Sequence, residues 1–87
     1  MNNSTVYKIA DNVKIRVEEF GLLVISRTTP ALALNNDMKN VWELIDGNNS
    51  VNDIFSIISR QYESEHLEEQ INDIFDNLLK LKLIEVI

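Results

Sequence analysis

The spacing of apolar residues changes once along this chain, near Asn35, and this change constrains the fold more than any other feature. Before Asn35 the apolar residues alternate with polar ones or form short runs, which is typical of β-strands. After Asn35 they recur at three- and four-residue steps, as on one face of a helix. We therefore expect an α+β fold that resembles a winged helix-turn-helix, with a three-stranded antiparallel sheet followed by three helices.

Three strands are expected before the change. Residues 13–17 alternate between apolar and polar and predict a half-buried strand, which residues 18–21 connect to the next by a tight turn. Residues 22–25 are apolar throughout and predict a central strand covered on both faces. After a second turn at residues 27–30, residues 31–34 alternate small and large side chains and predict a third strand at the edge.

Three helices account for the remaining apolar residues. The first should end at Gly47, and Ser50 with Asp53 resembles a capping box that starts the second. Ser64 is the expected cap of the third and longest helix, and residues 83–87 either continue it or form an extended tail. The apolar stripes consist of Met38, Val41, Trp42 and Ile45; of Val51, Ile54, Phe55, Ile58 and Tyr62; and of Leu67, Ile71, Ile74, Phe75, Leu78 and Leu81.

Length and composition indicate one domain, residues 1–87, with an ordered core at about residues 6–85. Hydrophobic residues make up 45% of the chain and charged residues 25%, so the domain should fold alone. Cysteine is absent from the sequence, which excludes disulfides and thiol chemistry. Neither a secretion signal nor an apolar run of membrane-spanning length is present, so we expect a cytoplasmic protein with no membrane partner.

Catalytic chemistry is not indicated by any motif. His66 stands at the polar start of the third helix without a second histidine nearby in sequence, and Gly21 and Gly47 form no phosphate-binding loop. The acidic residues of the third helix lie opposite its apolar stripe, where solvent exposure is their simplest explanation. We therefore expect a protein that is not an enzyme and has neither a cofactor nor a metal site.

The charge distribution bears on nucleic-acid binding, which is common among winged helices. The net charge is -6, and residues 41–87 carry three basic against ten acidic residues. A third helix this acidic would repel phosphates, so we expect no nucleic-acid partner. The basic residues Lys8, Lys14 and Arg16 nevertheless keep a DNA-binding regulator as an alternative, and a generic protein-interaction subunit is another.

The third strand is the most informative candidate site. It is an uncharged edge, and the small side chains of Ala31 and Ala33 would let another chain approach closely. An extended peptide can add to such an edge through main-chain hydrogen bonds. A flank of the third helix that contains Phe75 and Leu79 either lines pockets for this peptide or packs against the sheet alone; periodicity leaves both open. A second copy of the chain is an alternative occupant, which gives a monomer or a weak dimer.

The order of these segments resembles the PqqD-like family, whose members are also called RiPP precursor peptide recognition elements. The resemblance covers about residues 13–84 and rests on the basic alternation of residues 13–16, on Leu34-Asn35, on Asp46-Gly47, on residues 50–54 and on residues 78–84. It implies that the leader of a ribosomally synthesised precursor peptide binds as an extra strand in the cleft between the third strand and the third helix.

The resemblance also implies the contacts and the partners. The chain would act in trans, presenting the leader to a modifying enzyme or leader peptidase of a lasso-peptide or radical-enzyme pathway. By position, the leader-binding residues would be Thr29, Pro30, Ala31, Leu32, Ala33, Leu34, Asn35, Ile71, Asp73, Phe75, Leu78, Leu79 and Lys82.

Overall fold

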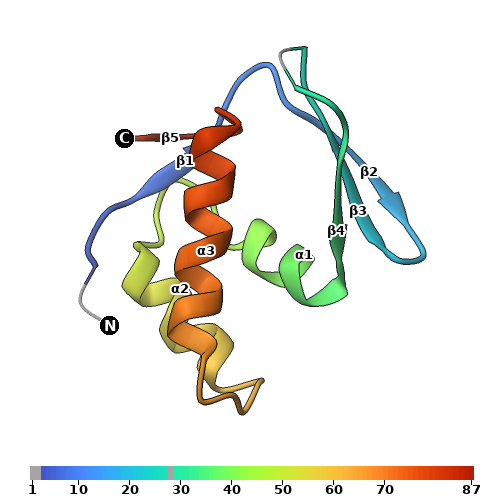
Figure 1. The fold of residues 1–87 in the computed structure, drawn as a ribbon. Coiled ribbons are helices and arrows are strands. Elements are labelled where there is room, and N and C mark those ends of the chain that lie inside the picture. The colour runs from blue at the N-terminus through green and yellow to red at the C-terminus, as the bar shows by residue number, and fades with distance from the viewer. Residues whose placement is uncertain (1–2, 28) are drawn as a thin grey trace.

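The computed structural model describes residues 3–27 and 29–87, and in that part of the chain the predicted order of strands and then helices is confirmed (Figure 1). Two short strands at the chain ends were not predicted. The predicted turn at residues 27–30 includes Thr28, which lies outside the described residues. The elements are β1 (Tyr7–Ile9), β2 (Lys14–Glu18), β3 (Gly21–Ile25), β4 (Leu32–Asn35), α1 (Asn36–Glu43), α2 (Val51–Ser59), α3 (Leu67–Lys80) and β5 (Ile84–Val86).

The main sheet is antiparallel with the order β2-β3-β4, so the predicted central strand is confirmed. Leu22 and Val24 of β3 are each 1% exposed, because α1 packs against this face. Ile25 is 40% exposed, so the prediction that this strand is covered on both faces was wrong. Gly21 pairs with Asn35, and a Cβ on Gly21 would lie 2.0 Å from the carbonyl oxygen of Leu34. Glycine is therefore required where β4 approaches β3.

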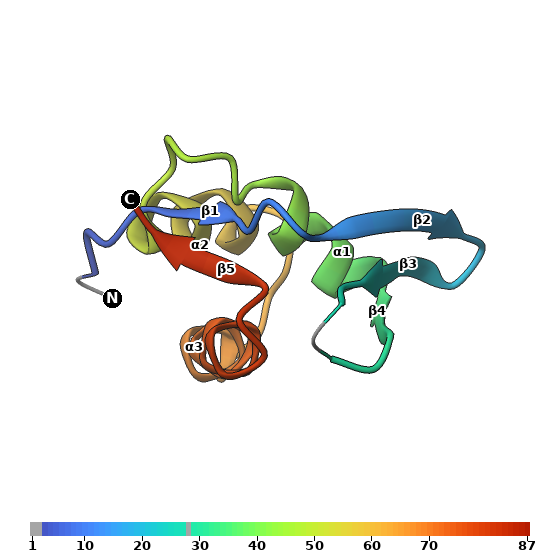
Figure 2. The same cartoon turned by 90° about the horizontal axis from the view of Figure 1, so that it is seen from above.

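The apolar side chains of β2 lie on the same side of the sheet as the buried side chains of β3, yet they are exposed. Ile15 pairs with Val24 and Val17 with Leu22, so all four share a face of the sheet. Ile15 is 51% exposed and Val17 is 68% exposed, because α1 packs mainly against β3 and β4. The prediction of a half-buried strand here was wrong, and Figure 2 shows β2 projecting beyond the helices.

Of the two helix starts expected from capping residues, one is confirmed, and the first helix has a cap that was not predicted. Asn35 Oδ1 accepts a hydrogen bond from the Met38 backbone N–H at 2.9 Å and caps α1. The capping box of α2 is confirmed by reciprocal bonds between Ser50 and Asp53 of 3.0 and 3.1 Å. Ser64 does not cap α3: its hydroxyl accepts from the His66 N–H at 3.2 Å, and the helix begins at Leu67.

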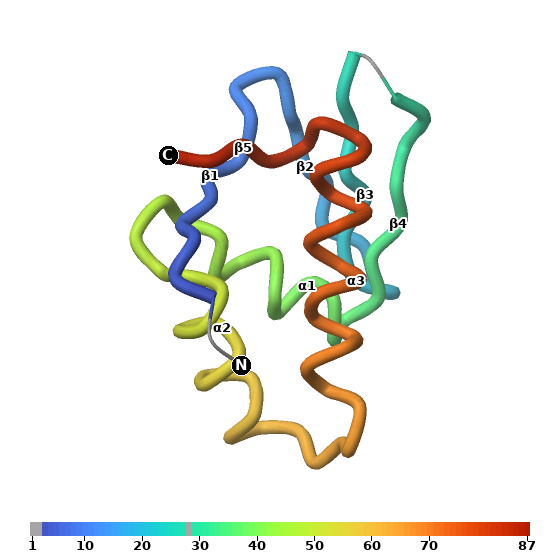
Figure 3. Tube along the Cα trace, turned by 60° about the vertical axis from the view of Figure 1, so that its left-hand side comes forward, coloured from blue at the N-terminus to red at the C-terminus, as the bar shows by residue number. Residues whose placement is uncertain are grey.

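The two chain ends pair with each other in a separate antiparallel sheet of β1 and β5, in which Ile9 lies opposite Ile84. This resolves the open question about residues 83–87 in favour of an extended segment. The small sheet lies on the opposite side of α3 from β4 (Figure 3). The core fills the space between the sheets and the helices; its side chains exposed by less than 2% are Leu22, Leu34, Ile54, Ile71, Leu78, Leu83, Val24 and Val51.

Candidate functional site

The free edge of β4 presents unused main-chain groups. Two residues connect Glu18 to Gly21, and in such a hairpin the residues on either side of the turn exchange main-chain hydrogen bonds. Along an antiparallel strand, the main-chain N–H and C=O groups point toward one neighbouring strand and then toward the other at successive residues. By this alternation Leu22 bonds to Leu34, and the N–H and C=O of Ala33 point away from β3. Ala33 is exposed, so its main-chain donor and acceptor are both accessible at the edge.

An apolar groove runs between this edge and α3. It has a volume of about 270 Å³, and the core-facing side chains of Leu32 and Leu34 form one wall. Ile74, Leu78 and Leu81 form the opposite wall. Met38 and Asn77 also line it, and Lys80 lies at its margin on the last turn of α3. An extended chain on the β4 edge would therefore lie beside an apolar surface.

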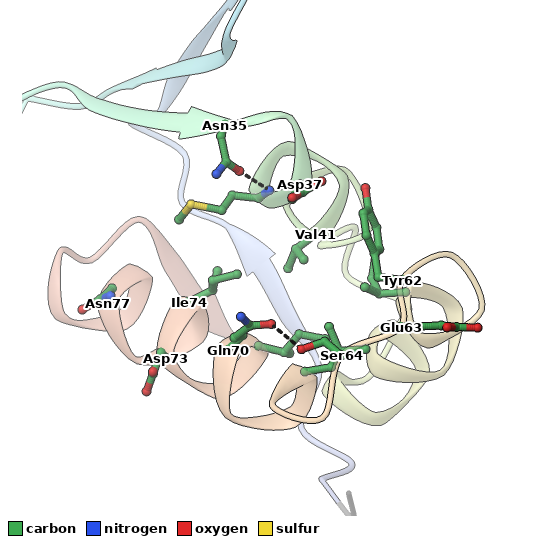
Figure 4. A pocket seen from close by; sticks show the side chains of 14 residues that line it. Asn35, Asp37, Val41, Tyr62, Glu63, Ser64, Gln70, Asp73, Ile74 and Asn77 are labelled. Atoms are coloured by element: carbon green, nitrogen blue, oxygen red, sulfur yellow. Dashed lines mark hydrogen bonds between the residues drawn. The ribbon is translucent and has the colours of Figure 1, made fainter.

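A larger cavity of about 530 Å³ continues along α3, between α1 and the segment that connects α2 to α3 (Figure 4). Met38, Ile74 and Asn77 line both cavities, so the two adjoin along α3, and together they are called the groove below. Val41 and Ile71 are buried and belong to the floor of the larger cavity. Its full lining is Asn35, Asp37, Met38, Val41, Ile58, Tyr62, Glu63, Ser64, Leu67, Gln70, Ile71, Asp73, Ile74 and Asn77.

Hydrogen bonds hold the mouth of the larger cavity in place. Asn40 Nδ2 donates to the hydroxyl of Tyr62 at 2.6 Å, which ties the α2–α3 connection to α1. The Ser64 hydroxyl donates to Gln70 Oε1 at 3.4 Å, which ties the same connection to α3. The aromatic ring of Tyr62 is thus fixed beside the cavity.

The two ends of the groove differ in charge. Asp37, Glu63 and Asp73 lie around the larger cavity, and its described lining residues include neither lysine nor arginine. Lys80 lies at the smaller end. The groove therefore combines an apolar floor with an acidic rim at one end and a single positive charge at the other, which suits an extended peptide better than a polyanion.

Several of the residues expected from sequence come together here. Leu32, Leu34 and Leu78 line the smaller end, and Asn35, Ile71 and Asp73 line the larger cavity. Pro30 and Ala31 are exposed in the segment that leads into β4, and Thr29 is partly buried there with its hydroxyl 3.1 Å from that of Ser26.

Three expected residues lie elsewhere. Phe75 is 4% exposed and its ring stacks against Tyr7 of β1, on the other side of α3 from the groove. Leu79 is 36% exposed and does not line either cavity. Lys82 lies in the turn between α3 and β5. The flank of α3 chosen from the sequence was therefore not the one that faces β4.

Three lining residues that the sequence did not predict lie on the opposite flank of α3. Ile74, Asn77 and Leu81 follow one another at three- and four-residue steps, so they share a face of α3. Met38 was assigned to the core but lines both cavities. A helical wheel gives these groupings, but the choice of flank depends on β1 and β5, which the sequence pattern did not reveal.

The sequence matches the family model described as Coenzyme PQQ synthesis protein D (PqqD) over residues 22–84. The chain belongs to the PqqD family. The matched segment of this PqqD-family protein begins in β3 and ends in β5, so it contains β4, α1, α3 and both walls of the groove. A comparison with curated proteins gives no match.

Among solved structures, TbiB1 in complex with the TbiA(beta) leader peptide is similar to this PqqD-family protein. The TM-score is 0.79 at 20% sequence identity, and the superposition covers 90% of this chain and 94% of the other. The two sequences are far apart, and the comparison shows a shared fold over nearly the whole length of both chains.

The structure also bears on other kinds of site. In residues 3–27 and 29–87, acidic and histidine side chains do not gather in groups of three that would hold a metal ion. Within the same residues, every helix is too short or too polar to cross a membrane.

Proposed function

We propose that this PqqD-family protein binds the leader segment of a ribosomally synthesised precursor peptide, as an added strand on β4, and presents it to a modifying enzyme or leader peptidase. The observation that carries the proposal is the free main-chain edge at Ala33 beside the apolar groove between β4 and α3. Main-chain bonds to this edge would provide affinity, and side chains at every second position of the leader would enter the groove.

The comparisons support this proposal. TbiB1 has a similar fold and its solved structure contains a leader peptide. Membership of the PqqD family supports a role beside biosynthetic enzymes rather than on DNA. The acidic residues Glu69, Asp73 and Asp76 of α3 also argue against DNA binding, because they would repel nucleic-acid phosphates.

The groove chemistry suggests which leaders bind best. Large apolar side chains fit the floor formed by Val41, Ile71 and Ile74. A lysine or arginine of the leader next to the larger cavity would be attracted by Asp37, Glu63 and Asp73. An acidic leader residue would be accommodated at the smaller end near Lys80.

The mechanism is one of effective concentration. Holding the leader keeps the attached core peptide near the active site of the partner enzyme, and this protein supplies no catalytic group. The leader is ordered on binding and loses conformational entropy, so a dissociation constant on the order of 1 μM, about 8 kcal/mol, is expected. Precursors of this kind are made on cytosolic ribosomes, where the protein would meet them.

Fluorescence anisotropy with a labelled leader, taken from the precursor encoded beside this protein, tests the proposal. Ala33→Pro removes the outward N–H while leaving the β3–β4 bonds intact, so it should abolish saturable binding in a folded protein. Ala33→Ser keeps this N–H and should bind as the wild type does. If the wild type does not bind at high micromolar concentration, or if the proline variant binds equally well, strand addition at β4 is excluded.

A further inference from the structure

The second free edge of the main sheet, β2, also exposes apolar side chains. Ile15 and Val17 are 51% and 68% exposed, although they share a face with the buried Val24 and Leu22. Phe20, in the turn after β2, is 49% exposed. An edge strand with uncovered β-branched residues is a surface that soluble proteins normally avoid or use for association.

The main-chain groups of β2 alternate in the same way as those of β4. Glu18 bonds to Gly21, and the alternation then directs Arg16 and Lys14 toward β3. The N–H and C=O groups of Ile15 and Val17 therefore point away from the sheet. The two residues with free main-chain groups are thus the two whose apolar side chains are exposed.

The charges of β2 are self-complementary in one orientation. Its sequence is Lys-Ile-Arg-Val-Glu, from Lys14 to Glu18. If two copies align antiparallel with Arg16 opposite Arg16, then Lys14 of each copy faces Glu18 of the other, and Ile15 faces Val17. The 15–17 pairs then carry the hydrogen bonds, as the outward main-chain groups require.

We propose that β2 is the interface of a homodimer in which two β2 strands pair antiparallel about Arg16. The two opposed guanidinium groups are the one like-charge pair of this arrangement, and each is already bonded to Glu18 of its own chain. Parallel pairing in register would instead place Lys14 beside Lys14 and Glu18 beside Glu18, which disfavours that arrangement. The partner at this surface is therefore a second copy of this chain.

The dimer would join two three-stranded sheets into one sheet of six strands. Because β4 is on the opposite edge of each sheet from β2, both β4 edges remain free at its ends. The homodimer would thus carry two open peptide grooves, a property that goes beyond the proposed binding of one leader by one chain. Only a few residues pair, so the association should be weak, with a dissociation constant on the order of 100 μM.

Sedimentation velocity of the full chain over 10 μM to 1 mM, about a hundredfold range around that constant, tests this inference. Lys14→Glu creates two like-charge pairs and should weaken dimerisation roughly tenfold. Glu18→Lys creates the same two like-charge pairs and also removes the contact of Glu18 with Arg16, so it should weaken dimerisation at least as much. The double variant Lys14→Glu/Glu18→Lys restores the opposite-charge pairs and puts a carboxylate two residues before Arg16 on the same face, so it should recover most of the wild-type constant. Arg60→Glu is the control for Lys14→Glu: it makes the same change in net charge at an exposed residue at the end of α2, and it should leave the dimer dissociation constant unchanged.

Proline variants separate this inference from the proposed function. Val17→Pro removes an outward N–H of β2 and should abolish the dimer while leader binding persists, whereas Ala33→Pro should abolish leader binding while the dimer persists. A concentration of 1 mM is about tenfold above the expected dissociation constant, so a chain that stays monomeric there would overturn the dimer. A dimer that survives Val17→Pro, or that the double charge reversal does not restore, would place the interface elsewhere.

Discussion

The ring of Tyr7 stacks against Phe75, with centroids 5.4 Å apart and ring planes inclined by 29°. This contact joins β1, at the start of the chain, to the middle of α3. It fixes the rotation of α3 about its own axis, because the Phe75 flank must face β1 and β5. The opposite flank, with Ile74 and Asn77, is thereby turned toward β4 and lines the groove.

Replacing Phe75 by leucine should destabilise the fold without weakening leader binding. The substitution removes the stacked pair and leaves part of a buried volume unfilled, which should lower the free energy of unfolding by about 1–2 kcal/mol. Urea denaturation measures this change, and anisotropy with the labelled leader measures affinity. A folded Phe75→Leu protein with reduced affinity would show that Phe75 acts in the groove.

The two flanks of α3 can be compared directly with a pair of truncations. Ile74→Ala removes side-chain surface that both cavities share, so it should weaken leader binding about tenfold. Leu79→Ala changes a residue on the Phe75 flank and should alter the dissociation constant less than about twofold. Equal losses for the two variants, both verified as folded by circular dichroism, would contradict the assignment of flanks.

Which flank of α3 faces β4 could not be predicted from the sequence. Alternation placed Leu32 and Leu34 on the core side of an edge strand, and helical periodicity predicted all three helices. It did not predict β1 and β5, because three-residue strands are too short to show alternation and their pairing joins opposite chain ends. Without that sheet, Phe75 and Ile74 were equally good candidates to face β4.

The exposure of β2 has a related cause. Alternation shows that Ile15 and Val17 share a face, but it carries no information about how far a helix extends over that face. The eight residues of α1 cover β3 and β4, and β2 lies beyond them. The same pattern therefore predicted burial for a strand whose apolar side is free for association.

The loop between α1 and α2 should make stability depend on pH. The Asp46 carboxylate accepts hydrogen bonds from the backbone N–H groups of Asn49 and Asn48, both at 2.9 Å, and these bonds lower the pKa of Asp46 below its ordinary value of 3.8. A lowered folded-state pKa stabilises the fold above the unfolded-state pKa, and this stabilisation is lost as the pH falls through the folded-state pKa.

Asp46→Asn tests this dependence because it keeps an oxygen acceptor and removes the charge. Its melting temperature should lie below that of the wild type at pH 7, and the difference should shrink below about pH 4 as Asp46 becomes protonated. Thermal unfolding of both proteins between pH 2 and pH 7, a range that spans the ordinary carboxyl pKa of about 4, measures it. A difference that does not change with pH would mean that the carboxylate charge does not contribute.

Replacing Lys82, at the end of α3, by glycine should stabilise the fold. The N–H of Leu83 bonds to the Leu78 carbonyl and that of Lys82 to the Leu79 carbonyl, both at 3.0 Å, which forms a Schellman motif with Lys82 at φ 57°. A left-handed conformation costs a lysine roughly 1–2 kcal/mol, and glycine adopts it freely at some cost in unfolded-state entropy. Lys82→Gly should therefore raise the free energy of unfolding by about 0.5–1 kcal/mol.

Lys82→Ala, which loses the charge but keeps the strain, should remain within about 0.5 kcal/mol of the wild type. Urea denaturation distinguishes them, and a glycine variant no more stable than the alanine variant would show that the turn stores no strain at Lys82.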